Sequence, residues 1–233
     1  KKAIEMAADY LLQLENFSPS QVFENKLEAA LGGASLEAKS GKLASLARPF
    51  LDAVAAPTAT PGGGSVSALA AALSASLGQM VAGLSRKKKS QAAHVDELSE
   101  ELDALRKIAD ELTEAIDRDA EAYDAVMAAF KLPQGNAEET RQREEAIQMA
   151  TKGAAEVPLE VAEKAARLHQ RLLQLEAIAA ASMKSDLQVA RLMAMAGAKG
   201  ALANVEINLE GLKDAGYAAR IKAKVDKLRT QLG

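Results

Sequence analysis

The chain has 233 residues and a formal net charge of −3, with 29 basic and 32 acidic side chains that alternate along the sequence. This balance forms no wide basic patch, so we expect no nucleic-acid partner. Hydrophobic residues make up 48% of the chain, aromatic residues only 3%, and cysteine is absent, which excludes thiol chemistry and favours helices packed through small side chains.

The first part of the chain predicts two short helices, at residues 3–15 and 21–31. A stretch rich in Gly, Ser and Lys follows at residues 31–42 and is typical of a linker. We therefore place a domain boundary at about residue 43, between residues 1–43 and residues 44–233. No secretion signal opens the chain and no apolar run reaches the roughly 18 residues of a membrane span, so we expect a cytoplasmic protein that crosses no membrane.

A helix predicted from Leu46 leads into a segment rich in Pro and Gly, and Ser65 then predicts the N-cap of a long helix. One apolar stripe follows this helix at spacings of three and four: Val66, Leu69, Leu73, Leu77, Met80 and Leu84. Its other faces carry Ala, Ser and Gly where a surface helix would carry charges, so we expect neighbours on most sides. The helix should end at the basic run of residues 86–89, which could also attract a polyanionic substrate.

The helix start carries Gly62, Gly63, Gly64 and Ser65 in succession. Open backbone N–H groups at a helix N-terminus favour an anion, and glycines let a ligand approach closely. A tight turn followed by a cap explains the same residues, so both interpretations stay open at this point.

A longer helix is predicted from about residue 94 to residue 130, and its apolar stripe continues to Asp119, where the pattern calls for a core residue. Burial raises the pKa of a carboxyl group toward the range used for proton transfer near neutral pH. The alternative is an ion pair with Lys or Arg from a neighbouring helix or a second subunit. Asn136 and Glu139 predict a capping box at the next helix, which Pro158 should kink or divide.

Ser185 and Gln188 predict the start of a further helix that reaches about Leu212, with Asp186 in its first turn. Asp186, next to Lys184 and Ser185, could serve a site or simply complement the helix dipole.

Asn204 and Asn208 share one face of that helix and could orient a polar heterocycle or bond across a subunit interface. His94 and His169 lie on different helices, so we expect no metal site.

A last amphipathic helix is predicted after the helix that ends at about Leu212, and no segment predicts a strand. The chain therefore predicts an all-α, largely up-and-down bundle.

Five motifs occur in order: PGGGSVSALAAALSASLGQMV, DAEAY with KLP after it, VPL, SDLQVA, and GALANVEINL followed by Asp214. Over about residues 46–220 they resemble the cyclodeaminase domain of the formiminotransferase-cyclodeaminase family and the related methenyltetrahydrofolate cyclohydrolases. The segment AADYLLQLENFSPSQVFENKL resembles the end of the formiminotransferase part of such proteins. We therefore expect a fragment or processed form of a fused enzyme.

The resemblance implies a helical homodimer, or a higher homo-oligomer, with a folate site near the subunit interface. The implied reaction, in histidine degradation and one-carbon metabolism, turns 5-formiminotetrahydrofolate into 5,10-methenyltetrahydrofolate and ammonia. Its substrate is a tetrahydrofolate derivative, with or without a polyglutamate tail, and it uses no metal or prosthetic group. A cyclohydrolase and a non-catalytic dimerisation module are the alternatives.

Carried onto this sequence, the resemblance makes Asp119 the proton carrier and Asp186 a second carboxylate. It assigns substrate contacts to Gly62, Gly63, Gly64, Ser65, Lys184, Ser185, Asn204 and Asn208. One departure is the pair Ala179 and Ala180, where many relatives carry Gly-Asn. If that pair contacts folate, its loss changes affinity or specificity.

Overall fold

The structure is a computed structural model that describes residues 42–232. The predicted short helices and most of the predicted linker lie outside the described residues, so the boundary near residue 43 stays a prediction. The chain divides into two compact units, residues 1–49 and residues 50–233. Helix α3 (Ala44–Ala55) contains this division and matches the helix predicted from Leu46.

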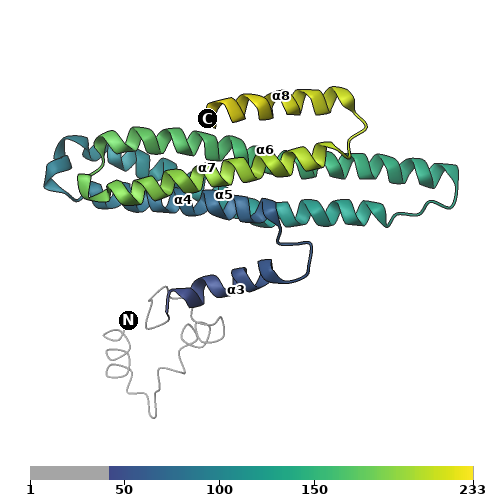
Figure 1. Ribbon diagram of the computed structural model, residues 1–233, viewed down its shortest axis with the longest axis horizontal. Helices are drawn as coiled ribbons and strands as arrows, with labels where there is room; N and C mark the ends of the chain where they lie inside the picture. The colour runs from purple at the N-terminus through teal and green to yellow at the C-terminus, as the bar shows by residue number, and fades with distance from the viewer. Residues whose placement is uncertain (1–41, 233) are drawn as a thin grey trace, which may run out of the picture. The chain divides into compact units, whose positions relative to one another are not determined.

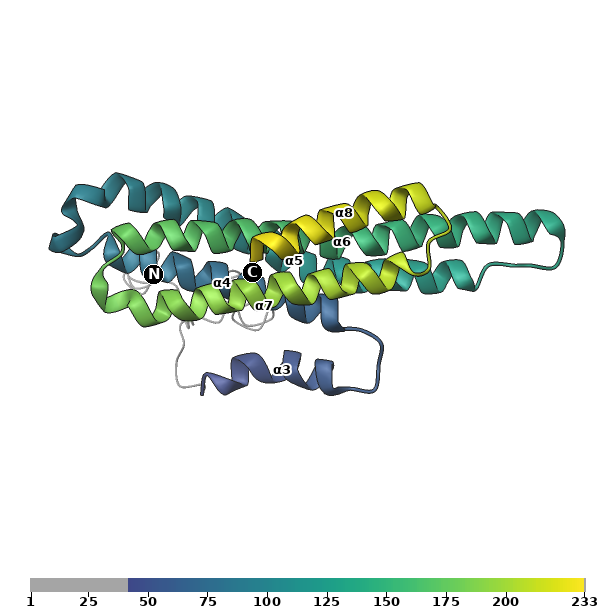
Figure 2. The same ribbon diagram turned by 45° about the horizontal axis from the view of Figure 1, so that its top comes forward.

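Four long helices form an antiparallel bundle in the second unit (Figures 1 and 2). They are α4 (Gly63–Ser85), α5 (Val95–Phe130), α6 (Ala137–Ile178) and α7 (Lys184–Leu209). Helices α4 and α6 each pack against both α5 and α7, and α8 (Ala215–Leu232) lies against α6 and α7. Short 3₁₀ helices join α4 to α5 (η2, Lys89–His94) and α6 to α7 (η3, Ala181–Met183). No strand occurs within the described part of the chain, so the predicted all-α up-and-down bundle is confirmed.

Helices α5 and α6 run on beyond the other two helices of the bundle (Figure 1). At 1.5 Å per residue they are about 54 and 63 Å long, whereas α4 and α7 are about 35 and 39 Å long. The apolar stripe of α5 therefore changes its surroundings along the helix. Leu105 and Leu112 are fully buried, while Tyr123, Met127 and Phe130 are exposed on the projecting part.

The apolar stripe of α4 is not the face that this helix buries within one copy of the chain. Its small residues face the core, including Ala68, Ala71 and Ala75, which have no exposed surface. Four members of the predicted stripe are 39–51% exposed instead: Val66, Leu73, Met80 and Leu84. The expected neighbours on most sides are therefore missing along this stripe, because closely packed helices bury the side that lets their backbones approach.

Close packing is most evident where α4 crosses α7. A Cβ atom on Gly197 would lie 2.8 Å from the Ser67 carbonyl oxygen, so only glycine fits there. The Ser74 hydroxyl donates to the Ala190 carbonyl at 2.7 Å, which satisfies a polar group in the same interface.

Helix α4 is also long and apolar enough to cross a membrane, with a mean hydropathy of 1.4 over its best window. No uninterrupted apolar run of about 18 residues was expected, and Ser, Gly and Gln do interrupt α4, yet its mean hydropathy reaches that of a candidate span. Half of that window is buried inside the bundle, and core helices of soluble proteins pass the same test.

Two predicted N-caps were wrong by a few residues. The N-cap of α4 is Gly62, so Ser65 lies within the first turn of the helix. The N-cap of α7 is Met183, which makes no side-chain capping bond, and Ser185 lies inside the first turn. Asp186 is in the first turn as predicted, and α7 ends at Leu209 instead of about Leu212.

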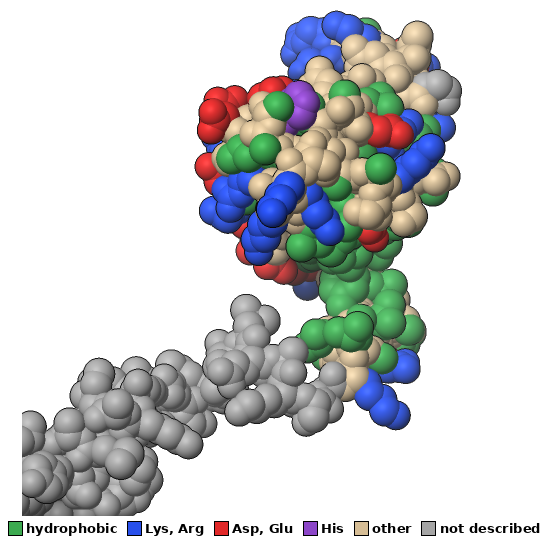
Figure 3. All heavy atoms as spheres, turned by 90° about the vertical axis from the view of Figure 1, so that its left-hand side faces the viewer, with side chains coloured by type: hydrophobic (Ala, Val, Ile, Leu, Met, Phe, Trp, Pro, Cys, Tyr) green, Lys and Arg blue, Asp and Glu red, His purple; other side chains and the backbone are tan. Residues whose placement is uncertain are grey.

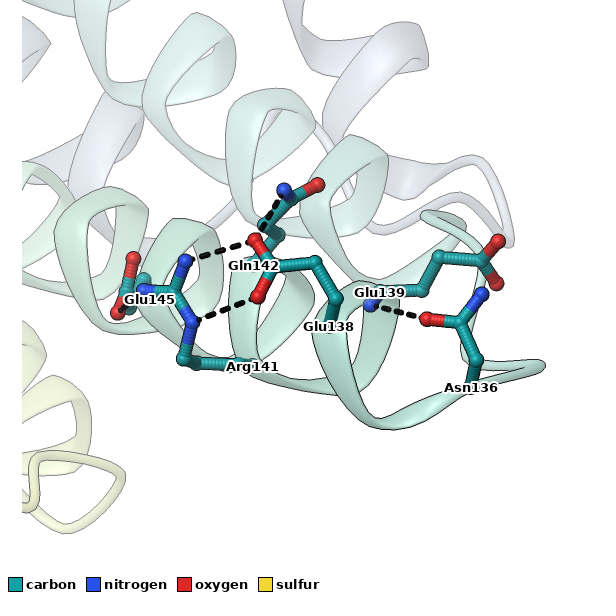
Figure 4. Close-up of polar contacts among 6 residues, drawn as sticks. All are labelled: Asn136, Glu138, Glu139, Arg141, Gln142 and Glu145. Carbon is teal, nitrogen blue, oxygen red and sulfur yellow. Dashed lines mark hydrogen bonds and ion pairs between the residues drawn. The ribbon is translucent and has the colours of Figure 1, made fainter.

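The N-cap predicted for α6 is confirmed (Figure 4). The Glu139 N–H donates to Asn136 Oδ1 at 2.9 Å. The Glu139 carboxylate accepts from the Gly135 N–H at 2.8 Å, one residue before the position in a standard capping box. Pro158 lies inside α6 without ending it.

The first turn of α8 is fixed to α6 by two polar contacts. Asp214 accepts from the Tyr217 N–H at 2.9 Å and from Lys152 Nζ at 2.8 Å, and the bond from Lys152 holds the pKa of this carboxyl below its usual value. The Tyr217 hydroxyl donates to Glu156 at 2.9 Å, and burial raises its pKa to about 12. Since the folded state lowers the pKa of Asp214, its contribution to stability is present at neutral pH and is lost in acid.

Candidate active site

A cavity of about 320 Å³ lies between the start of α4, the last third of α5, the middle of α6 and the second half of α7. It is lined by Ala59, Thr60, Gly62, Gly63, Gly64, Asp119, Tyr123, Val126, Ala154, Asn204, Ile207 and Asn208. Six predicted site residues, drawn from three distant motifs, therefore meet in one place. A larger hollow of about 500 Å³ between α6 and α8 contains none of them.

The glycines at the start of α4 allow two side chains to approach its backbone. A Cβ atom on Gly64 would lie 2.0 Å from Asp119 Oδ1, which is far inside any allowed contact. A Cβ atom on Gly63 would lie 3.3 Å from Asn204 Nδ2. The glycine run therefore does more than turn the chain, because Gly64 makes room for the Asp119 carboxylate.

The N-terminus of α4 opens into the same cavity. The first helical hydrogen bond joins the Val66 N–H to the Gly62 carbonyl at 3.0 Å, so the three preceding N–H groups have no partner within the helix. Gly62 has no side chain to cap them, and the first turn contains no acidic residue. This end of the helix provides a partial positive charge for a ligand.

Asp119 is half-buried at the point where α5 leaves the four-helix section. Its Oδ2 accepts a hydrogen bond from the Ser65 hydroxyl at 3.0 Å. The neighbouring Arg118 pairs with Glu160 of α6 instead, at 3.0 Å. Among the ion pairs of the described residues none joins Asp119 to Lys or Arg, which speaks against pairing with a neighbouring helix of the same subunit and leaves pairing with a second subunit as a prediction.

Ser65 lies behind the cavity wall and does not line the cavity. The residue is fully buried, and its hydroxyl lies 3.0 Å from both Asp119 Oδ2 and the Ile116 carbonyl oxygen. The predicted contact between Ser65 and a substrate stays a prediction, whereas its contact with Asp119 is direct.

The two asparagines are anchored by their own amide groups. Asn204 Nδ2 donates to the Gly200 carbonyl at 2.9 Å, and Asn208 Nδ2 donates to the Ala154 carbonyl at 2.8 Å. Each side chain still carries a carbonyl oxygen and a second N–H. A ligand in the cavity would meet donors and acceptors whose positions are already fixed.

Lys184, Ser185 and Asp186 lie at the opposite end of the bundle. Asp186 and Asn204 are 18 residues apart on α7, which corresponds to about 27 Å along the helix. Lys184 lines a separate hollow of about 360 Å³ together with His169 and Arg191. A single copy of the chain therefore does not bring this group to Asp119.

The basic run of residues 86–89 follows the end of α4 and is exposed at this same end. The end of α4 contacts the segment that leads into α7, since the Ala180 N–H donates to Ser85 Oγ at 2.9 Å. Figure 3 shows the face at this end, where Lys and Arg side chains gather beside apolar ones.

Sequence reasoning missed six cavity residues: Ala59, Thr60, Tyr123, Val126, Ala154 and Ile207. A signal existed for Tyr123, which lies one helical turn after Asp119 and belongs to the same DAEAY motif. Groups of three or more His, Cys, Asp or Glu side chains that could hold a metal ion were not found within residues 42–232.

Comparison with known proteins gives matches over the same region. The family model of formiminotransferase-cyclodeaminase matches residues 47–227. Formimidoyltransferase-cyclodeaminase of Gallus gallus is 38% identical over 180 residues, which are 77% of this chain and 33% of that protein. The chain thus spans about a third of the length of this relative.

Two further relatives are proteins that the matched region covers almost completely. Methenyltetrahydrofolate cyclohydrolase of Methylorubrum extorquens is 35% identical over 188 residues, 79% of this chain and 88% of that protein. The crystal structure of formiminotetrahydrofolate cyclodeaminase from Thermotoga maritima superimposes with a TM-score of 0.71 at 28% identity, and covers 79% of this chain and 88% of its own.

Proposed function

Because the chain belongs to the formiminotransferase-cyclodeaminase family, we propose that it converts 5-formiminotetrahydrofolate to 5,10-methenyltetrahydrofolate and ammonia. The observation that carries the proposal is the cavity in which Asp119 lies against Gly64, close to Asn204 and Asn208. A place in histidine degradation and one-carbon metabolism, a fused formiminotransferase domain and a cytoplasmic location belong to the same proposal.

The reaction needs one group that accepts a proton and returns it. Starting from the protonated formimino group, N10 of the folate attacks the formimino carbon and a tetrahedral centre forms. Asp119 takes the proton that N10 loses and delivers it to the amino nitrogen, which leaves as ammonia while the C–N5 double bond forms. Atoms and charge balance without a metal or prosthetic group, and a single well-placed carboxylate is sufficient.

The cavity suits the reacting part of a folate. Its volume of about 320 Å³ is at the lower end of the range for small-molecule sites. Asn204 and Asn208 offer amide groups to the polar edge of the pterin, and Tyr123 offers an aromatic face. The glycines of α4 let the ring approach Asp119.

The proposed function is tested by supplying two substrates separately. With 5-formiminotetrahydrofolate, methenyl absorbance and ammonia should appear in equal amounts. If the protein instead opens methenyltetrahydrofolate to 10-formyltetrahydrofolate and releases no ammonia, it is a cyclohydrolase, the second candidate that the Methylorubrum extorquens relative favours. If a folded protein does neither, both enzymatic proposals fail and the non-catalytic module remains.

We also propose a homodimer that covers the exposed apolar face of α4 and α7. The face consists of Val66, Leu73, Met80 and Leu84 on α4 together with Val189, Leu192 and Ile207 on α7. Helix α4 contains no charged residue, and Ile207 also lines the cavity. A contiguous face of this kind is typical of a protein interface.

A two-fold dimer would also explain how Lys184 and Asp186, at the opposite end of the bundle from Asp119, can belong to the same site. If the α7 helices of two copies lie antiparallel, the start of one helix meets the end of the other. Lys184 of the partner subunit and Asp186 of the partner subunit would then lie near the cavity. There Lys184 could bind the carboxylates of the glutamate tail.

Leu73→Glu should convert the proposed dimer to a monomer. The charge would have to be buried at the centre of the apolar face, so we expect the dissociation constant to rise by about 30-fold or more, the loss typical of a hot-spot residue. Met149→Glu is the matched control, since Met149 is 75% exposed on α6, outside this face. Sedimentation velocity measures both; a wild-type monomer at micromolar concentration, or equal dissociation in both variants, contradicts the proposed interface.

A further inference from the structure

The Ser65 hydroxyl has two acceptors and one proton. Asp119 Oδ2 and the Ile116 carbonyl oxygen both lie 3.0 Å from Ser65 Oγ. A hydroxyl donates one hydrogen bond at a time. Because Ser65 is fully buried, water does not compete for that proton. The hydroxyl therefore donates to one of the two oxygens at a time.

Ser65 differs in this respect from other serines of α4. Ser67 and Ser76 donate to carbonyls four residues earlier in their own helix, at 2.7 and 2.9 Å. The corresponding residue for Ser65 is Pro61, which precedes the helix. The Ser65 hydroxyl is therefore directed across to α5 instead of back along α4.

The alternative acceptor is available whatever the state of Asp119. Ile116 lies inside α5, where its carbonyl accepts one helical N–H and keeps a second lone pair. Turning the hydroxyl from Asp119 to Ile116 breaks no covalent bond and leaves no buried donor without a partner. The exchange is thus a rotation of the O–H group alone.

We propose that Ser65 is a positioning residue for Asp119, which donates to Oδ2 while Asp119 is a carboxylate and shifts its proton toward the Ile116 carbonyl when protonation at Oδ1 makes Oδ2 a weaker, neutral acceptor. With Oδ2 held from behind by Ser65, Oδ1 is the oxygen that exchanges the proton with the substrate. This inference rests on the proposed function, and it gives Ser65 a part in the reaction without contact to the folate.

Few other ionisable groups surround this pair. Tyr123 is the other titratable residue that lines the cavity, while α6 and α7 contribute Ala154 and neutral asparagines. Helix α4 has no charged residue. Arg118 lies next to Asp119 in sequence and is paired with Glu160 of α6. The Ser65 bond and the positive end of α4 are therefore the local interactions that distinguish the two states of Asp119.

The test replaces Ser65 by Ala and by Cys and uses Ser99→Ala as the matched control. Ser99 donates only along its own helix, to the Val95 carbonyl at 2.7 Å. Without the Ser65 donor the carboxylate form loses a hydrogen bond, so the acid limb of the pH profile of turnover should move up by about one pH unit. The Cys variant keeps the volume with a weaker donor and should fall between Ala and wild type.

A second measurement does not depend on activity. The carboxyl carbon of Asp119, labelled with ¹³C and assigned by its loss in Asp119→Asn, is followed by NMR from acid to neutral pH. Its titration midpoint should rise in Ser65→Ala and stay unchanged in Ser99→Ala. Unchanged midpoints in both variants overturn the role of Ser65, even in an active enzyme. A shifted midpoint in a protein without cyclodeaminase turnover supports the role of Ser65 and contradicts only the proposed function.

Discussion

Asp119→Asn should lower the turnover of 5-formiminotetrahydrofolate by about 10²–10⁴-fold, the usual contribution of a general acid–base group. The amide has nearly the same shape and can still accept from Ser65 through its oxygen, so the bundle should fold as before. It cannot take the N10 proton, so the tetrahedral centre should no longer form and collapse efficiently. Steady-state turnover and far-ultraviolet circular dichroism measure the two effects.

The matched control is Asp117→Asn on the same helix. Asp117 is exposed and lies two residues before Asp119, so it points away from the cavity side. This change removes the same charge from the same stretch of α5 and should leave turnover within about twofold. Nearly full activity in Asp119→Asn, or an equal loss in both variants, contradicts the assignment of Asp119 as the proton carrier.

Local rules predicted the features that depend on nearby residues. The cap of α6 was predicted because Asn136 and Glu139 form it within one turn. Asp119 was singled out because a 3.6-residue period placed a carboxylate on an apolar stripe, and the structure places it at the cavity. The cap predicted at Ser65 was wrong, because the rule favours serine, whereas the helix begins within the glycines.

The rest depends on contacts between distant segments. The contact of Gly64 with Asp119 joins residues 55 positions apart, and no local pattern encodes it. Neighbours were expected on most sides of α4, but the sequence did not predict which face stays open in one copy of the chain, because a hydrophobic stripe fits a protein interface as well as a core. The separation of Lys184 from Asn204 follows from the length of α7 alone, and helix arithmetic could have predicted it.

Gly64→Ala should reduce turnover by about 100-fold, the loss that a misplacement of 1 Å can cause in an active site. The new Cβ atom would lie 2.0 Å from Asp119 Oδ1 and 2.4 Å from its Cγ, so the carboxylate must move and its bond to Ser65 must break. Gly153→Ala is the control, because a Cβ atom there meets nothing within 4 Å. That variant should keep full activity and gain up to about 1 kcal/mol from helix propensity. Turnover and thermal unfolding of both variants separate the two effects: an active Gly64→Ala protein would show that the Asp119 position seen here is not the one used in catalysis.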